Sequence, residues 1–293
     1  MTTQKGTGRP TPGAGETMNP PSTTTQASPR SRIHRIAVFS YGIASYAIGV
    51  AALVGLILFM LGVFRFRGTP LGDLGLGAAL TVDALLLITF AVQHSLMARP
   101  GFKARWTRII PPAAERSTYV LMTGLVIVLW LALWQPMPTI VWSLESPMLR
   151  WTALGVALVG WAYLFLATFA INHFELFGLQ QVWQALRGHP LTPALFQERW
   201  MYRFDRHPLM TGVLVGVWVT PTMTLDHLLF AAGTTLYVWI GVFFEERSLQ
   251  RQFGRRYEDY RQRVGTIVPT FASWRPERAK VAGHGPGDSA DSR

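Results

Sequence analysis

The stretch RHPLMTGVLVGVWVTPTMTLDHLLFAAGTTLYVWIGVFFEER, residues 206–247, decides the fold class. It contains two apolar runs, Pro208–Thr224 and Asp226–Phe244, joined by a connection short enough for only a tight hairpin. A helix rises about 1.5 Å per residue, so each run approaches the roughly 30 Å thickness of a bilayer's hydrocarbon core. Backbone groups in lipid must be satisfied within their own segment, so we expect two antiparallel membrane helices.

Four more apolar runs precede this hairpin: Ile36–Phe64, Leu74–Met97, Ser117–Trp134 and Trp151–Ile171. Charged residues make up only 15% of the chain, well below the usual quarter of a soluble domain. After the hairpin, Phe253, Tyr257 and Tyr260 fall on one helical face, which predicts an amphipathic helix in the cytoplasm. The sequence therefore predicts an all-α integral membrane protein with about six transmembrane helices.

The net charge of +11 lies almost entirely outside the apolar runs. Basic loops beside membrane spans explain it better than nucleic-acid binding does, so we expect no nucleic-acid partner. Arginines and lysines gather before the first run, between the second and third, between the fourth and fifth, and after the sixth. The positive-inside rule then places both termini in the cytoplasm. Arg65 and Arg67, which this orientation would place outside, are the one exception to the rule.

Composition separates the ends of the chain from its centre. Residues 1–33 are rich in Thr, Pro, Gly and Ser and predict a disordered basic tail, and residues 271–293 predict a second disordered tail. Residues 34–270 form the expected transmembrane domain. The chain has no cysteine, which excludes disulfides, thiolate nucleophiles and cysteine-based metal sites.

Polar residues converge at the cytoplasmic ends of four predicted helices. The groups are Gln93 and His94; Asn172, His173 and Glu175; Arg206 and His207; and Glu245, Glu246 and Arg247. Ionisable residues at membrane depth are costly and usually mark function, so this convergence predicts a site. Asp83 lies deep in the second run and is expected to be protonated, paired or lining a polar cavity.

Pro208 predicts that a helix starts there and that His207 lies just outside it. The free N–H groups of such a helix end suit a carboxylate or phosphate. Gly212 and Gly216 have small-residue spacing, which favours close helix packing, within one chain or between chains, over ligand contact. Glu245 and Glu246 are expected to return to the level of His207, as ligand contacts or as partners for Arg247 or Arg206.

Two sets of motifs carry a family resemblance. The first set is Arg206-His207-Pro208 with Gly212, Glu245-Glu246-Arg247, Leu249, Phe253-Gly254, Tyr257, Tyr260 and Pro269. With this set, residues 206–269 resemble the catalytic region of the isoprenylcysteine carboxyl methyltransferase family, although Met210 stands where those enzymes commonly have an aromatic residue. The second set is Gln93-His94-Ser95, Met97-Ala98-Arg99-Pro100, Glu115-Arg116-Ser117-Thr118-Tyr119, Asn172-His173-Phe174-Glu175-Leu176-Phe177-Gly178-Leu179 and Thr220-Pro221-Thr222-Met223-Thr224. With this set, most of residues 34–270 resembles the bacterial methanethiol S-methyltransferases.

The resemblance implies S-adenosylmethionine as methyl donor, methanethiol as acceptor, dimethyl sulfide as product and a bacterial inner membrane as location. We hypothesise that the donor's carboxylate lies at the start of the fifth helix. The expected cofactor-binding residues are Arg206, His207, Pro208, Gly212, Glu245, Glu246 and Tyr257. For the thiol proton, His173 is the first candidate base, with Glu175 orienting it or alternating with it, and His94 is the second. No metal is expected.

Two alternatives stay open at this point. The acceptor could be a prenylated cysteine, a lipid or another small thiol, which acceptor profiling separates. The second alternative is that the protein is a transporter or a non-catalytic membrane module. Transporters often show inverted repeats or helices broken in mid-membrane, and neither is evident in the sequence.

Overall fold

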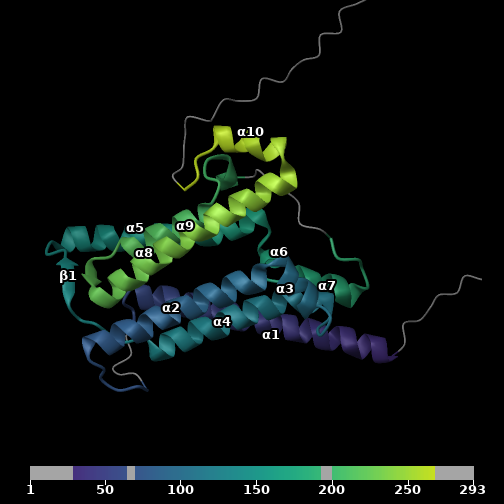
Figure 1. Cartoon of the computed structure of the whole chain (residues 1–293), viewed down its shortest axis with the longest axis horizontal. Helices are drawn as coiled ribbons and strands as arrows, with labels where there is room; N and C mark the ends of the chain where they lie inside the picture. The colour runs from purple at the N-terminus through teal and green to yellow at the C-terminus, as the bar shows by residue number, and fades with distance from the viewer. Residues whose placement is uncertain (1–28, 65–69, 193–199, 268–293) are drawn as a thin grey trace, which may run out of the picture.

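The computed structural model describes residues 29–64, 70–192 and 200–267 (Figure 1). Most of the two expected tails, and Arg65 and Arg67 with them, lie outside the described residues. The first helix begins at Pro29, earlier than the expected domain boundary at residue 34.

Among the described residues, five helices are long and apolar enough to cross a membrane. They are α1 (Pro29–Met60), α2 (Leu76–Ala98), α4 (Glu115–Leu133), α5 (Pro147–Ile171) and α9 (Leu225–Phe253). Their lipid-compatible surfaces carry exposed apolar side chains such as Leu85, Leu158 and Leu236. The prediction of an all-α integral membrane protein is therefore confirmed.

The fifth predicted membrane helix is shorter than expected. Helix α8 (Pro208–Trp218) has 11 residues and rises only about 16 Å, roughly half of a hydrocarbon core. The chain then becomes extended, because Pro221 disfavours helix in Thr220. Strand β2 (Thr222–Thr224) follows and pairs antiparallel with β1 (Ile140–Ser143). A strand of a two-stranded sheet thus replaces the C-terminal end of the helix that the sequence predicted.

Shorter elements complete the fold. They are α3 (Pro100–Trp106), α6 (His173–Leu176), α7 (Leu179–Arg187), α10 (Arg255–Arg263) and the 3-10 turns η1 (Pro112–Ala114) and η2 (Trp200–Arg203). Figure 1 shows α3, α6 and α7 together at the end of the bundle opposite β1. The bundle therefore has a plain end with a small sheet and a polar end with several short helices.

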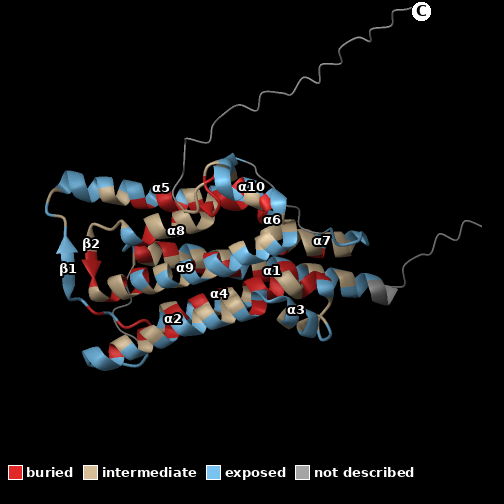
Figure 2. Cartoon of the chain, turned by 45° about the horizontal axis from the view of Figure 1, so that its top comes forward, coloured by how far each residue is buried: buried red, intermediate tan, exposed pale blue. Residues whose placement is uncertain are grey.

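The long helices form two groups. Helix α1 packs on α4, and α4 packs on α2, while α8 packs on α5 and α9. Helix α2 also contacts α9 and so joins the groups. Buried residues line the inner faces of both groups (Figure 2), with Trp130, Trp134, Trp161 and Phe230 in one apolar cluster. This core holds the helix ends in fixed positions.

Glycines allow α5 and α8 to approach closely. A Cβ added at Gly212 would lie 2.6 Å from the backbone nitrogen of Leu164 and 2.7 Å from the carbonyl oxygen of Gly160. A Cβ at Gly216 would lie 2.5 Å from the ring of Trp161. The packing interpretation of this glycine pair is therefore confirmed, and the packing is within one chain.

Asp83 is fully buried in α2, where its Oδ1 accepts a hydrogen bond from the backbone N–H of Gln135 at 2.8 Å. Among the described residues, its Oδ2 has no hydrogen-bond partner. The bond to Gln135 ties the loop after α4 to α2. Asp83 therefore has a structural role far from the polar end.

Candidate active site

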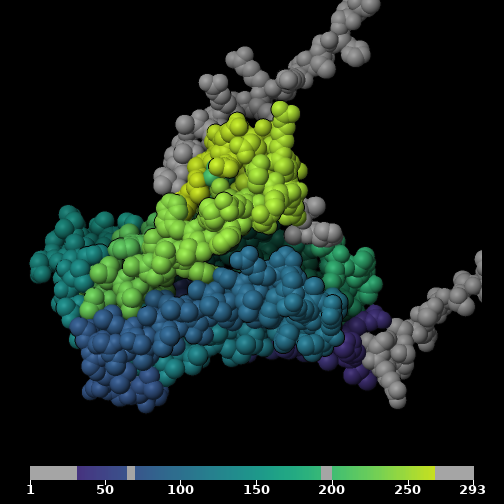
Figure 3. Space-filling view, viewed as in Figure 1, coloured from purple at the N-terminus to yellow at the C-terminus, as the bar shows by residue number. Residues whose placement is uncertain are grey.

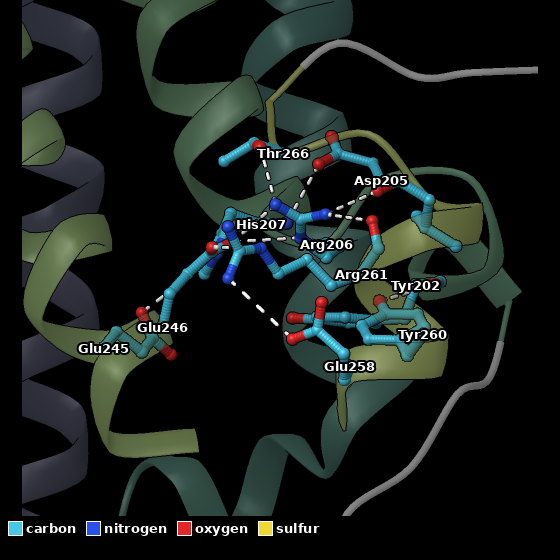
Figure 4. A network of polar contacts seen from close by, with 11 residues as sticks. Tyr202, Asp205, Arg206, His207, Glu245, Glu246, Glu258, Tyr260, Arg261 and Thr266 are labelled. Carbon is cyan, nitrogen blue, oxygen red and sulfur yellow. Dashed lines mark hydrogen bonds and ion pairs between the residues drawn. The ribbon is translucent and has the colours of Figure 1, made fainter. Parts of the chain in front are cut away.

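The first polar cluster, which we call the arginine cluster, consists of Asp205, Arg206, His207, Glu245 and Glu246 (Figure 4). The first three residues directly precede α8, and the two glutamates belong to α9. Glu246 Oε1 lies 3.2 Å from His207 Nε2, and Glu245 Oε2 lies 3.6 Å from His207 Nδ1. The predicted return of both glutamates to the level of His207 is therefore confirmed.

All five N–H donors of Arg206 are engaged within the protein. Its Nε and Nη2 reach Glu246 Oε1 at 2.9 and 2.7 Å. Its Nη1 donates to the carbonyl oxygens of Arg261 and Val264 at 2.8 and 2.7 Å, and its Nη2 also donates to Thr266 Oγ1 at 2.6 Å. Arg206 was predicted to bind the cofactor, but this saturation leaves it no donor for a ligand.

These bonds fix the C-terminal helix α10 over the arginine cluster. The carbonyls that Arg206 binds belong to the last turn of α10 and the residue after it, where a cation also complements the helix dipole. Tyr257 and Tyr260 of α10 are also buried against Leu249 and Phe253. Figure 3 shows α10 as a cap beyond the end of α9.

The structure has a short helix, α10, where the sequence predicts an amphipathic helix, and a break separates it from α9. Gly254 has a φ of 54°, in the left-handed region that favours glycine, and it separates α9 from α10. Tyr257 is 1% exposed, and burial followed by the charge of Glu246 raises its pKa to about 12. The phenol group of Tyr257 is thus neutral where it packs between α10 and the end of α9.

Asp205 occupies the start of α8. It is fully buried, its Oδ1 accepts the backbone N–H of His207 at 2.9 Å, and its Oδ2 accepts the hydroxyl of Thr211. Pro208 has no N–H, and the N–H groups of Met210 and Thr211 bond to the carbonyl of His207. The protein thus supplies a carboxyl group of its own at this helix start, and the binding of a cofactor carboxylate there stays a prediction.

His207 is 5% exposed and lies between two carboxylates. Burial lowers the pKa of His207, but the hydrogen bonds and charges of Glu245 and Glu246 outweigh it, so that the net pKa is raised. Glu246 forms an ion pair with Arg206, whereas the side chain of Glu245 is 51% exposed. Glu245 is therefore the member of the cluster with acceptor capacity for a ligand.

The second polar cluster, the histidine cluster, consists of Tyr46 of α1, Thr168 of α5 and His173. His173 Nε2 lies 2.9 Å from the hydroxyl oxygen of Tyr46, and its Nδ1 lies 2.8 Å from Thr168 Oγ1. The ring stacks on Phe169 with centroids 4.2 Å apart and also contacts Phe177. Burial lowers the pKa of His173, so the ring is neutral at neutral pH.

Glu175 does not orient His173. Its backbone N–H donates to Asn172 Oδ1, and its carboxylate accepts from Asn172 Nδ2 at 3.1 Å. This reciprocal pair is a helix cap at the start of α6. The predicted orienting role of Glu175 is therefore wrong, since Tyr46 and Thr168 bond to both ring nitrogens of His173. The role of Glu175 as an alternative base stays a prediction.

His94 belongs to the interface between α2 and α4. Its Nε2 lies 2.7 Å from the hydroxyl of Tyr119, and its Nδ1 lies 3.3 Å from Thr123 Oγ1. Its ring stacks on Phe90. Phe177, which contacts His173, also packs on the cluster that contains Tyr119. His94 therefore borders the histidine cluster without joining its hydrogen bonds.

Helix packing sets the two polar clusters at one level of the bundle. Gly212 faces Leu164 and Gly216 faces Trp161, so α5 and α8 run antiparallel. Continuing that register by one turn brings Pro208 level with Thr168, because both helices rise equally per residue. The His207 and His173 ends of the two clusters are therefore close in depth.

Asp205, Tyr46 and Thr168 were not predicted as site residues. Asp205 directly precedes Arg206-His207, so its position offered a signal. Tyr46 and Thr168 lie inside apolar runs with no local motif around them. Their partners are distant in the chain, and only the packed structure brings them together.

No group of three His, Asp or Glu side chains in the described part of the chain is arranged to hold a metal ion. The donor set instead offers carboxylates, imidazoles and hydroxyls. Such groups can hold the ammonium and hydroxyl groups of an organic cofactor and can move a proton.

Comparisons with known proteins give the chain its family. Methanethiol S-methyltransferase 1 of Bradyrhizobium diazoefficiens is 43% identical over 240 residues, 82% of this chain and 84% of that protein. The methanethiol S-methyltransferase of Mycobacterium tuberculosis is 43% identical over 235 residues, 78% and 94% of the two chains. Rat nurim is 32% identical over 188 residues, 61% of this chain and 71% of nurim.

Neither a family model nor a solved structure matches the chain. The identity to the bacterial enzymes extends over most of both chains. The chain therefore belongs to the methanethiol S-methyltransferases, a family of membrane methyltransferases.

Proposed function

We propose that this protein transfers the methyl group of S-adenosylmethionine to methanethiol, forming dimethyl sulfide, at a cytoplasm-facing site of the bacterial inner membrane. The observation that best supports the proposal is that the arginine cluster and the histidine cluster lie at the same level along the helices. One contains a half-exposed carboxylate, and the other a buried neutral imidazole. Family membership supplies the reaction type.

The arginine cluster is the proposed cofactor end. Glu245 has a half-exposed carboxylate that suits the ammonium or the ribose hydroxyls of S-adenosylmethionine, and its Oε2 lies 3.6 Å from His207 Nδ1. Arg206, Pro208 and Glu246 hold this end of α8 and α9 in place, and Gly212 lets α8 approach α5. Tyr257 holds α10 over the cluster. The bound cofactor supplies an activated methyl group on a sulfonium.

The acceptor must lose a proton. An alkyl thiol is more basic than the reference cysteine at about 8.5, so most of it is protonated at neutral pH. His173 is the proposed base, because burial keeps its ring neutral and able to accept a proton. The aromatic rings of Phe169 and Phe177 around it exclude water and favour a small apolar acceptor. Alignment of thiolate and methyl group contributes much of the acceleration.

Headspace gas chromatography of membranes supplied with S-adenosylmethionine and methanethiol tests the proposal. Wild type is expected to release dimethyl sulfide. Glu245→Gln should raise KM for S-adenosylmethionine about 10- to 100-fold, since hydrogen bonds to charged groups are worth about 1.5–3 kcal/mol. Glu145→Gln is the matched control, because Glu145 is an exposed acid near β1 at the other end of the bundle.

Three results would contradict the proposal in different ways. Wild-type membranes that transfer labelled methyl groups to lipid or prenylated cysteine, but not to methanethiol, would show that the acceptor is wrong. An unchanged KM in Glu245→Gln would remove Glu245 from the cofactor site. Absence of any methyl transfer would overturn the enzymatic assignment.

A further inference from the structure

The protonation state of His173 follows from the bonds of its neighbour Thr168. The hydroxyl of Thr168 donates its one hydrogen to the carbonyl oxygen of Phe165 at 2.6 Å. A carbonyl can only accept, so Thr168 Oγ1 must accept the bond that it shares with His173 Nδ1. His173 therefore carries its proton on Nδ1 and presents an unprotonated Nε2.

This tautomer fixes the role of Tyr46. An unprotonated Nε2 can only accept, so the hydroxyl of Tyr46 donates to it at 2.9 Å. The hydroxyl oxygen of Tyr46 then has lone pairs left for a second partner. His173 is 5% exposed, whereas Tyr46 is only half-buried. Of these two side chains, Tyr46 is therefore the one that a substrate can reach, and its hydroxyl group covers Nε2 of His173.

Tyr46 also spans the two groups of helices. It belongs to α1, which packs with α4, whereas His173 follows α5, which packs with α8. The edge of the Tyr46 ring meets His173 and Phe177, with centroids 5.8 Å away in each case. These contacts hold the hydroxyl group of Tyr46 at the polar end of the bundle, near the level of Thr168 and Pro208 along the helices.

We propose that Tyr46 is the catalytic residue that takes the proton of the acceptor thiol, as the first member of a Tyr46–His173 relay. The inference rests on the proposed thiol methylation and names the residue that meets the thiol. The S–H bond breaks as its proton passes to the Tyr46 oxygen, and the Tyr46 proton passes to His173 Nε2. The sulfur keeps the electron pair that then forms the bond to the methyl carbon, and the sulfonium sulfur takes the pair of the broken bond.

The surroundings of His173 suit the receiving end of this relay. Burial lowers the pKa of His173, which keeps Nε2 free of a proton before the reaction. After the transfer, Nδ1–H still donates to Thr168 Oγ1, so no bond must rearrange. Proton transfer by a positioned side chain typically contributes about 10²- to 10⁴-fold to a rate.

The variant Tyr46→Phe tests the relay, because it keeps the ring and its edge contacts and removes only the hydroxyl. With methanethiol, kcat is expected to fall about 10²-fold or more. With methaneselenol, which has nearly the same shape and is ionised at neutral pH, kcat should stay close to the wild-type value. Tyr41→Phe is the matched control on α1, since it removes a hydroxyl that bonds Thr118 instead.

Each outcome separates the relay from the proposed function. Equal losses with both acceptors would give Tyr46 a structural role only and overturn the relay. Full activity of Tyr46→Phe with methanethiol would overturn it as well. Wild-type membranes that methylate neither acceptor would overturn the proposed function itself, and the relay with it.

Discussion

At the scale of single residues, hydrogen-bond capacity separates structural from functional side chains. Arg206 has five donors and five internal contacts, so it holds α8, α9 and α10 together. Glu245 makes one long contact at 3.6 Å to His207 and is half exposed. Both residues were predicted to bind the cofactor from sequence position. The structure gives Arg206 the anchoring role and leaves Glu245 as the candidate ligand contact.

His207 predicts a pH-dependent stability. Its folded pKa is raised above the unfolded value of about 6.5. Its stabilising contribution is therefore complete below about pH 6.5 and is lost as the pH rises through the folded pKa. The difference in Tm between wild type and His207→Gln in detergent should be larger at pH 6 than at pH 9. His34→Gln, which changes an exposed histidine of α1, is the control. A difference that is the same at both pH values would contradict the prediction.

Residue-scale features were predictable where the signal is local. Pro208 correctly predicted the helix start and the position of His207, because proline restricts its own backbone and that of its neighbour. The bonds of Tyr46 and Thr168 to His173 were not predictable. They depend on the rotation of α1 and α5 about their axes, which no residue near Tyr46 or Thr168 encodes.

At the scale of elements, the pair α5–α8 carries most of the geometry of the site. Its glycines bring the helix backbones together and so fix the depth of both polar clusters. Five predicted spans match long helices, since a long apolar run has few other solutions in a membrane. The short α8 and the sheet β1–β2 were missed, because Thr222–Thr224 is apolar enough to extend a hydropathy window while its backbone finds a partner in Ile140–Ser143.

Gly212→Ala should destabilise this helix pair. The new methyl group would meet the backbone of Leu164 and Gly160, which cannot rotate away as a side chain can. Overpacking of this kind typically costs about 1–3 kcal/mol. Gly155→Ala in α5 is the matched control, because a Cβ there meets nothing within 4 Å. Thermal unfolding in detergent should show a lower Tm for Gly212→Ala and an unchanged or higher one for Gly155→Ala. Equal Tm values for the two variants would mean that the helices separate at little cost.

At the scale of the whole molecule, charge and shape indicate the same orientation. The sheet β1–β2 lies at one end of the bundle, in a region with few charges. The short basic helices and both polar clusters are associated with the other ends of the long helices. Basic residues near membrane helices favour the cytoplasm. We therefore expect β1 outside the cell membrane and the end of α9 inside, where S-adenosylmethionine is available.

The absence of cysteine makes this orientation directly measurable. Wild type cannot react with a maleimide at a thiol, so every labelled protein reports an introduced cysteine. Ser143→Cys in β1 and Gln252→Cys in α9 replace two exposed residues at opposite ends of the bundle. A membrane-impermeant maleimide applied to intact cells should label Ser143→Cys and should label Gln252→Cys only after permeabilisation. The reverse pattern would place both polar clusters outside the cell, away from the methyl donor, and would contradict the proposed site.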